Sequence, residues 1–213
     1  MTQFHQWYQE LQVERTIKAL KKNNFDARFF PKASEALAEV WKMIPEGSTV
    51  GCGGSLTLSQ IGFMEEAQKR SVKFLNPLAK GLSPEEAEKI RRQIFSADFF
   101  LASSNAVTED GKLYNIDATG NRVGAMIYGP KKVILLCGVN KIVKDLAEAQ
   151  KKVQEYTSPL NVKRLGSKNP CIQTGECSDC ASPERICNAY VILAKKPRRT
   201  DFSIFIIGEL LGL

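Results

Sequence analysis

The sequence lacks several features that mark common protein classes. Its 213 residues contain a single histidine, His5, which lies far along the chain from any candidate nucleophile, so a histidine-dependent catalytic triad is excluded. No apolar run has the length that a membrane-spanning helix needs, and the N-terminal segment lacks the apolar centre of a signal peptide. These absences predict a cytoplasmic protein without a membrane partner.

Signatures of nucleotide and nucleic-acid binding are also missing. The sequence has no G-x-G-x-x-G fingerprint for FAD or NAD, and it has no P-loop. The net charge is +7, from 30 basic and 23 acidic residues, but the basic residues occur in scattered pairs without interleaved aromatic side chains. Nucleic acid is therefore not an expected partner, whereas a small anionic ligand suits the charge.

What the sequence does contain is a regular alternation of strand and helix patterns. Two amphipathic helices flank a short strand within residues 1–45 and are expected to form an N-terminal cover. Further strands are expected at residues 48–52, 71–76, 97–103, 131–139, 191–196 and 203–210, the last two as a final pair. Helices are expected between them, at residues 57–70, from 83 and at 141–156. This alternation predicts a single α/β domain, residues 1–213, with a largely parallel sheet.

The first candidate site is a glycine loop between the strand at 48–52 and the helix that follows it. Its glycines would let backbone N–H groups approach an anion, and its hydroxyls would add donors. The residues concerned are Gly51, Gly53, Gly54, Ser55 and Thr57. Cys52, in the same loop, lies near a helix start, where the pKa of a thiol can fall. A tight strand-to-helix turn without a ligand explains the same glycines.

A second candidate begins where the strand at 97–103 ends, because ligands bind at this end of parallel strands. Ser104, Asn105 and Thr108 would orient a bound molecule, and Glu109 would act as a general base or nucleophile. Residues 106–116 also predict a β-hairpin that turns at Asp110-Gly111. Glu109 therefore also reads as a solvated turn residue.

A third candidate lies in residues 115–122. Arg122, with Asn121 beside it, would hold a carboxylate or phosphate through its planar guanidinium group. The alternative is a structural ion pair between Arg122 and Asp117. The sequence leaves both interpretations open.

The most distinctive segment is rich in cysteine and covers residues 168–190. Four of the six cysteines occur here with the spacing C-x5-C-x2-C-x6-C, namely Cys171, Cys177, Cys180 and Cys187. Thiolates are soft donors, and reduced cytoplasmic thiols favour a metal centre over disulfides, so the spacing predicts Zn²⁺ or an iron–sulfur cluster. A compact loop of thiols or disulfides is the alternative. The segment is expected to be an elaboration of the domain.

Several segments together resemble the LUD-domain family, and in particular its lactate-utilisation protein C group. The resemblance rests on GGSLTL, ASSNAVTEDGKLYNID, GPKKVILLCGVNKIV and the cysteine-rich segment, the last of which looks like a feature of one branch. It implies a Rossmann-like α/β sandwich of the sugar-phosphate isomerase and CoA-transferase-like class, with helices on both faces of the sheet. It also implies a role in oxidising L-lactate to pyruvate with iron–sulfur partner proteins. The alternatives are an independent sugar-phosphate or CoA-ester enzyme and a non-catalytic binding protein with structural zinc.

Overall fold

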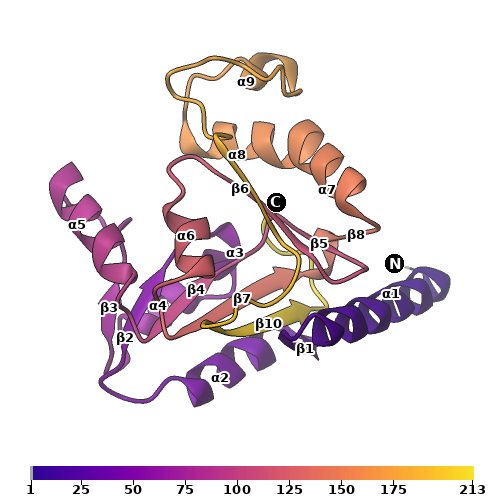
Figure 1. The fold of residues 1–213 in the computed structure, drawn as a ribbon, viewed down its shortest axis with the longest axis horizontal. Helices are drawn as coiled ribbons and strands as arrows, with labels where there is room; N and C mark the ends of the chain where they lie inside the picture. Colours follow the sequence, from indigo (N-terminus) through magenta and orange to yellow (C-terminus); the bar gives the residue numbers. More distant parts are fainter. Residues whose placement is uncertain (1) are drawn as a thin grey trace.

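The fold is built on a six-stranded sheet in which every pairing is parallel. The computed structural model describes residues 2–213, and the strands run in the spatial order β1-β10-β7-β4-β2-β3 (Figure 1). Their bounds are β1 (Asp26–Phe30), β2 (Thr49–Cys52), β3 (Lys73–Leu75), β4 (Phe99–Ala102), β7 (Lys132–Gly138) and β10 (Asp201–Ile207). The neighbours β7 and β10 are almost entirely buried, as is typical of parallel strands covered on both faces.

Helices cover both faces of this sheet (Figure 1). The helices over one face are α1 (Gln3–Lys22), α5 (Pro84–Ile94) and α6 (Asn121–Ile127), and those over the other are α2 (Ala33–Met43), α3 (Leu56–Gln60) and α4 (Phe63–Ala67). The strands divide their side chains between the two layers with a period of two. Leu135 and Ile204 pack into the first layer, and Leu136 and Phe205 into the second. The Rossmann-like α/β arrangement expected from the sequence is therefore confirmed.

A second sheet of four strands has mixed pairing and the order β8-β5-β6-β9. Its strands are β5 (Ala106–Thr108), β6 (Leu113–Asp117), β8 (Ile142–Val143) and β9 (Ala189–Leu193). β5 and β6 form the hairpin that Asp110-Gly111 predicts. Gly111 has a φ of +81°, and a Cβ atom there would lie 2.5 Å from the carbonyl carbon of Ala19 in α1. Only glycine lets the turn approach that helix so closely.

The chain between β8 and β9 forms the layer at the top of Figure 1. It contains α7 (Leu146–Lys152), a π-helical turn (Val153–Thr157), α8 (Ser158–Leu165) and the short α9 (Cys171–Thr174). A single 3₁₀ turn (Val139–Lys141) joins β7 to β8. Within residues 2–213, no helix combines the length and apolar character needed to cross a membrane.

The single helix expected over residues 57–70 is wrong. Gly62, with a φ of +78°, divides the segment into α3 and α4, because a left-handed residue cannot continue a right-handed helix. Ser55 caps α3 by accepting a hydrogen bond from the N–H of Leu58.

Two expectations near the C-terminus are also wrong. The helix expected over residues 141–156 begins only at Leu146, because the β-branched residues Ile142 and Val143 pair with β5 as a strand. The last two strands do not pair with each other. β9 joins β6 in the second sheet, whereas β10 inserts between β1 and β7.

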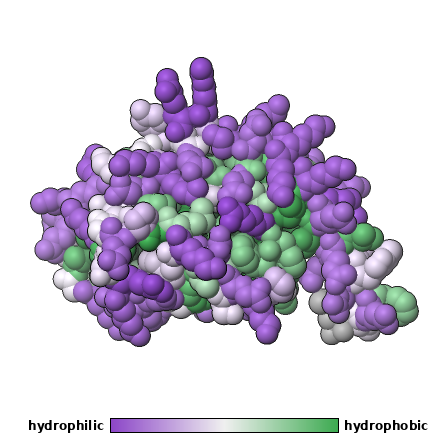
Figure 2. All heavy atoms as spheres, turned by 90° about the horizontal axis from the view of Figure 1, so that it is seen from below, coloured by the Kyte–Doolittle hydropathy of each residue, from purple (hydrophilic) through white to green (hydrophobic). Residues whose placement is uncertain are grey.

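The N-terminal cover is less complete than the sequence suggests. The second half of α1 packs against the domain through its buried residues Val13, Thr16 and Leu20. Near the start of the helix, Phe4 and Trp7 are 80% and 60% exposed. β1, between the two covering helices, is an edge strand of the main sheet. Apolar atoms are visible between polar side chains on the face seen from below (Figure 2).

Candidate anion-binding site

Five neighbouring strands of the parallel sheet end around one cavity. The residues that follow β2, β3, β4, β7 and β10 line it from the sheet side, and α5, α6 and α8 supply its other walls. Its volume is about 490 Å³, within the range of small-molecule sites. The cavity lies outside the carboxyl ends of the strands, where open α/β sheets bind ligands.

The glycine loop forms one wall of this cavity through Gly53, Gly54, Ser55 and Thr57. Its backbone is less available than the sequence suggests, because the N–H of Gly53 donates to the carbonyl of Leu101 at 3.0 Å. The helix that follows, α3, has only five residues, so its dipole is small.

Two neighbours of this loop do not serve a ligand. Gly51 does not line the cavity, and a Cβ atom there would lie 2.8 Å from the side chain of Ile94. This glycine therefore lets α5 pack against β2. The nearby helix start does not make Cys52 acidic, because burial raises the pKa of its thiol to about 12.

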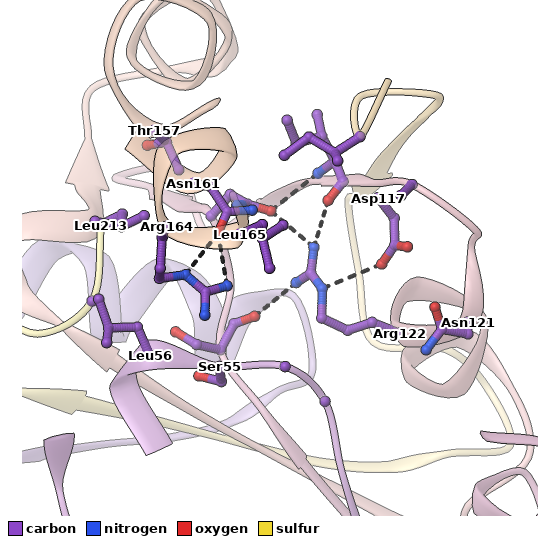
Figure 3. A pocket seen from close by; sticks show the side chains of 18 of the residues that line it. Ser55, Leu56, Asp117, Asn121, Arg122, Thr157, Asn161, Arg164, Leu165 and Leu213 are labelled. Carbon is purple, nitrogen blue, oxygen red and sulfur yellow. Dashed lines mark hydrogen bonds and ion pairs between the residues drawn. The ribbon is translucent and has the colours of Figure 1, made fainter. Parts of the chain in front are cut away.

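Arg122 is held in the cavity wall by a network of its own chain. Its Nη1 donates to the carbonyl of Ser103 at 2.9 Å and to Oδ1 of Asn115 at 2.8 Å, and its Nη2 donates to Oδ1 of Asn105 at 2.9 Å. Nη2 also donates to the carbonyl of Ile116, and Nε lies 3.3 Å from Oδ2 of Asp117 (Figure 3). Arg122 therefore forms the structural pair with Asp117, and it lines the cavity with its N–H donors already bonded within the chain.

Lys141 is the residue that sequence reasoning missed. Only 5% of its surface is exposed, and its Nζ donates to the hydroxyl of Ser103 at 2.9 Å and to the carbonyl of Ser104 at 3.0 Å. Its pKa is lowered to about 8, mainly by burial, and the nearby charge of Arg122 acts in the same direction. Its position just after the buried strand β7 was the available signal, because parallel strands present ligand-binding residues at that end.

The lining carries more positive than negative charge. It contains four cationic side chains, Arg91, Arg122, Lys141 and Arg164, and two carboxylates, Glu88 and Asp117. Both carboxylates pair with arginines, Glu88 with Arg92 at 3.0 Å and Asp117 with Arg122. Among residues 2–213, Lys141 and Arg164 form no ion pair. Arg164 bonds only to Oδ1 of Asn161 in its own helix and extends from α8 toward the loop of Ser55 (Figure 3).

The structure thus brings together most of the residues that the sequence singled out for binding. Eight of them line this cavity, namely Gly53, Gly54, Ser55, Thr57, Ser104, Asn105, Asn121 and Arg122. Thr108 does not, because it lies in the hairpin, where its hydroxyl donates to Asp110.

Glu109 also lies away from the cavity. Its carboxylate accepts hydrogen bonds from Nε2 of Gln12 at 3.0 Å and from Nε of Arg15 at 2.9 Å, both on α1. This placement gives Glu109 no access to a ligand in the cavity, so the role of general base or nucleophile there has no geometric support.

The four clustered cysteines line a second, smaller cavity beside α8, with a volume of about 20 Å³. Cys171 and Cys187 are buried, and Cys177 and Cys180 are partly exposed. In the part of the chain that the structure describes, no group of three or more histidine, cysteine or acidic side chains stands close enough together to hold a metal ion. The four thiols therefore line one cavity but do not surround a common metal position.

Comparisons with known proteins agree with this fold. A protein of the DUF162 family from Deinococcus radiodurans has a similar structure, with a TM-score of 0.54 and 12% identity over 94% of this chain and 98% of that one. Two others are less similar. eIF2B beta from Chaetomium thermophilum shares 16% identity over 55% of this chain and 44% of its own (TM-score 0.39), and ribose 5-phosphate isomerase from Plasmodium falciparum shares 14% over 59% and 65% (TM-score 0.33). Neither of these two carries an argument about function.

Sequence comparison identifies the family directly. No curated protein is significantly similar to the chain, but the model of the LUD domain matches residues 13–207. That range contains both sheets and both cavities, apart from Gly212 and Leu213 in the lining of the larger one. The chain belongs to the LUD domain family.

Proposed function

We propose that this protein binds a small organic anion in the cavity at the strand ends. The observation that carries the proposal is the environment of Lys141, a buried ammonium group in the cavity wall without a carboxylate partner among residues 2–213. A buried charge without a counter-ion is costly. A bound anion would supply the missing charge.

The lining favours an anion that also carries hydroxyl or carbonyl groups. Ser103 and Thr57 place hydroxyls next to Lys141, with 3.4 Å between their oxygen atoms. Arg164 would bind a second anionic or polar group from the opposite wall. This combination fits a carboxylate with a neighbouring oxygen, which is the pattern of a 2-hydroxy or 2-oxo acid.

The family resemblance suggests how binding would serve a reaction. L-Lactate would lose two electrons and two protons to give pyruvate, and iron–sulfur partner proteins would accept the electrons, since the sequence has no FAD or NAD fingerprint. In this proposal the chain is the substrate-binding subunit of a lactate-type oxidation system. Its residues would hold the carboxylate and shield the reacting carbon from water.

A phosphorylated sugar is the second candidate, because cationic side chains bind phosphate as readily as carboxylate. The cavity volume of about 490 Å³ leaves room for such a ligand. An independent sugar-phosphate enzyme would need a base other than Glu109, whose carboxylate is held by α1.

Binding measurements on two variants test the proposal. Calorimetric titrations with L-lactate, pyruvate and inorganic phosphate should show the organic acids binding more tightly than phosphate. Lys141→Met should weaken that binding about 100-fold, the value of one buried charge-assisted hydrogen bond. Arg164→Gln should weaken it less, about tenfold, because its guanidinium group is closer to solvent.

Lys144→Met is the matched control, because this lysine is exposed and does not line the cavity. It should bind like the unchanged protein. Full affinity in Lys141→Met would refute the anion site, and tighter binding of phosphate would favour the sugar-phosphate alternative. Absence of lactate-dependent electron transfer to the iron–sulfur partners would remove the oxidation role while leaving anion binding intact.

A further inference from the structure

The cysteine-rich segment brings thiols from a helix and from loops to one cavity. Cys171 begins α9, Cys177 and Cys180 lie in the loop after it, and Cys187 precedes β9, yet all four line the same cavity of about 20 Å³. The four thiols therefore face one shared space beside α8.

A turn at Asp179, held by Arg185, lies between the cysteines of this segment. Between Cys177 and Cys180, Asp179 adopts a left-handed conformation with a φ of +48°, which is uncommon for a residue other than glycine. The two cysteines that flank this residue both line the cavity. Arg185 holds the turn by donating to the carbonyls of Cys180 at 2.6 Å and Cys187 at 3.1 Å.

The two ends of the segment are fastened together. The N–H of Lys168 donates to Oε2 of Glu184 at 2.8 Å, and Nδ2 of Asn169 donates to the carbonyl of Glu184 at 3.0 Å. These bonds close the loop that contains Cys171, Cys177 and Cys180. The bonds to Glu184 therefore hold the two ends of this loop near each other.

We propose that the four thiols bind a single tetrahedral Zn²⁺ ion that stabilises one wall of the anion cavity. Binding replaces four S–H bonds with four Zn–S bonds and releases four protons, and no electron is transferred. The cavity between the thiols has a volume of about 20 Å³, which admits little more than one water-sized sphere and suits a single ion. The guanidinium group of Arg185, which also lines the cavity, offsets the negative charge of the thiolates.

Binding requires the thiols to move. They do not surround an ion position as they stand, and the partly exposed side chains of Cys177 and Cys180 would rotate toward Cys171 and Cys187. Rotation about one bond moves a sulfur atom without disturbing the bonds of Arg185 and Glu184.

The zinc site would lie directly behind the anion cavity. Ser158 and Ile186 line both cavities and therefore form part of the wall between them. The N–H of Asn188, just after Cys187, donates to the carbonyl of Asp117 at 3.0 Å, and its side chain donates to the carbonyl of Ala118. Ordering of the cysteine segment would therefore help to position two parts of the anion cavity. One is α8, which carries Arg164, and the other is the end of β6, where Asp117 pairs with Arg122.

The test is a metal analysis of the full chain, purified under reducing and anaerobic conditions. We expect about one equivalent of Zn²⁺ per chain in the unchanged protein and in Cys52→Ala, which removes a buried thiol outside the cluster. Cys177→Ser and Cys180→Ser should lose most of the metal. Replacing Zn²⁺ by Co²⁺ in the unchanged protein should give the visible bands of a tetrahedral thiolate site, a readout that does not depend on the variants folding.

The outcomes separate this proposal from the anion site. A metal-free protein that takes up neither Zn²⁺ nor Co²⁺ after reduction would overturn it, and so would disulfides among the four cysteines. Several iron atoms with inorganic sulfide would overturn the single-ion assignment. Loss of zinc should also weaken anion binding by a few fold through Arg164, whereas failure of Lys141→Met to change anion affinity would leave the metal result unaffected.

Discussion

The two cavities share a wall but are built in different ways. The larger one is lined by residues at the ends of five strands whose register is fixed by continuous parallel pairing. The smaller one is lined by α8, the four-residue α9 and loops, held by isolated hydrogen bonds at Arg185 and Glu184. A sheet positions side chains without help from a ligand, whereas loops of this kind gain much of their order from one.

The two cavities also differ in the charge of the side chains that line them. The larger cavity contains the buried cation Lys141 and would attract the proposed anion. The smaller one contains four thiols that become anionic when they bind a cation. Each cavity therefore lacks the charge that its proposed ligand would bring, but only the smaller one should lose its shape when the ligand is removed.

The largest expected effect is a local loss of order when zinc is removed. Cleavage by trypsin after Lys168 and Arg185, within the cysteine segment, should accelerate about tenfold or more, because cleavage of a loop follows the population of its open form. The six-stranded sheet should remain resistant. Mass spectrometry of the fragments, with and without a zinc chelator, measures both regions in one experiment.

Cys177→Ser serves as the control for this experiment. It should already be cleaved quickly, and the chelator should have no further effect on it. Equal acceleration across the sheet and the cysteine segment would show that the two regions unfold as one unit and would remove the contrast between them.

The sequence predicted the parts of the fold that follow from local pattern. β7 and β10 are continuous apolar runs, and the start of α5 carries the expected capping box, in which Ser83 and Glu86 bond to each other's backbone N–H. The hairpin at Asp110-Gly111 was also predicted, because its turn dipeptide is local. The pairing of β9 with β6 was not, since nothing in either strand specifies a partner far along the chain.

The sequence predicted most of the polar residues that line the larger cavity, but not Lys141. Small polar residues after β2 and β4 marked the correct end of the sheet, as Ser55 and Ser104 show. Lys141 escaped notice because its segment resembled the first turn of a helix, and a lysine there is usually solvated. Its burial follows from the 3₁₀ turn and β8, which depend on pairing with β5.

A smaller but sharper effect is expected from pH, where the two cavities should respond in opposite directions. Lys141 binds an anion as the ammonium form, and its pKa is about 8. Anion affinity should therefore be nearly constant below pH 8 and fall by up to about tenfold for each unit above it. Titrations between pH 6.5 and 9.5, roughly centred on this pKa, measure the slope.

Zinc affinity should rise over the same interval, because the thiols must lose protons to bind. Burial raises the pKa values of Cys171 and Cys187, so the rise should continue above the usual range for thiols. Lys141→Met should abolish most of the pH dependence of anion binding without altering that of zinc. If anion affinity and zinc affinity changed in the same direction with pH, the ligand proposed for one of the two cavities would be wrong.

The smallest effect is expected from Glu109→Gln, in a third region that contacts neither cavity. The new amide can still accept a hydrogen bond from Gln12 and loses only its ion pair with Arg15 at the surface, an interaction of low value. Anion affinity, zinc content and the trypsin cleavage pattern should all remain unchanged, with at most a slight decrease in melting temperature. Loss of anion binding or turnover in this variant would show that the hairpin reaches the ligand, and would restore Glu109 as the base that the sequence suggested.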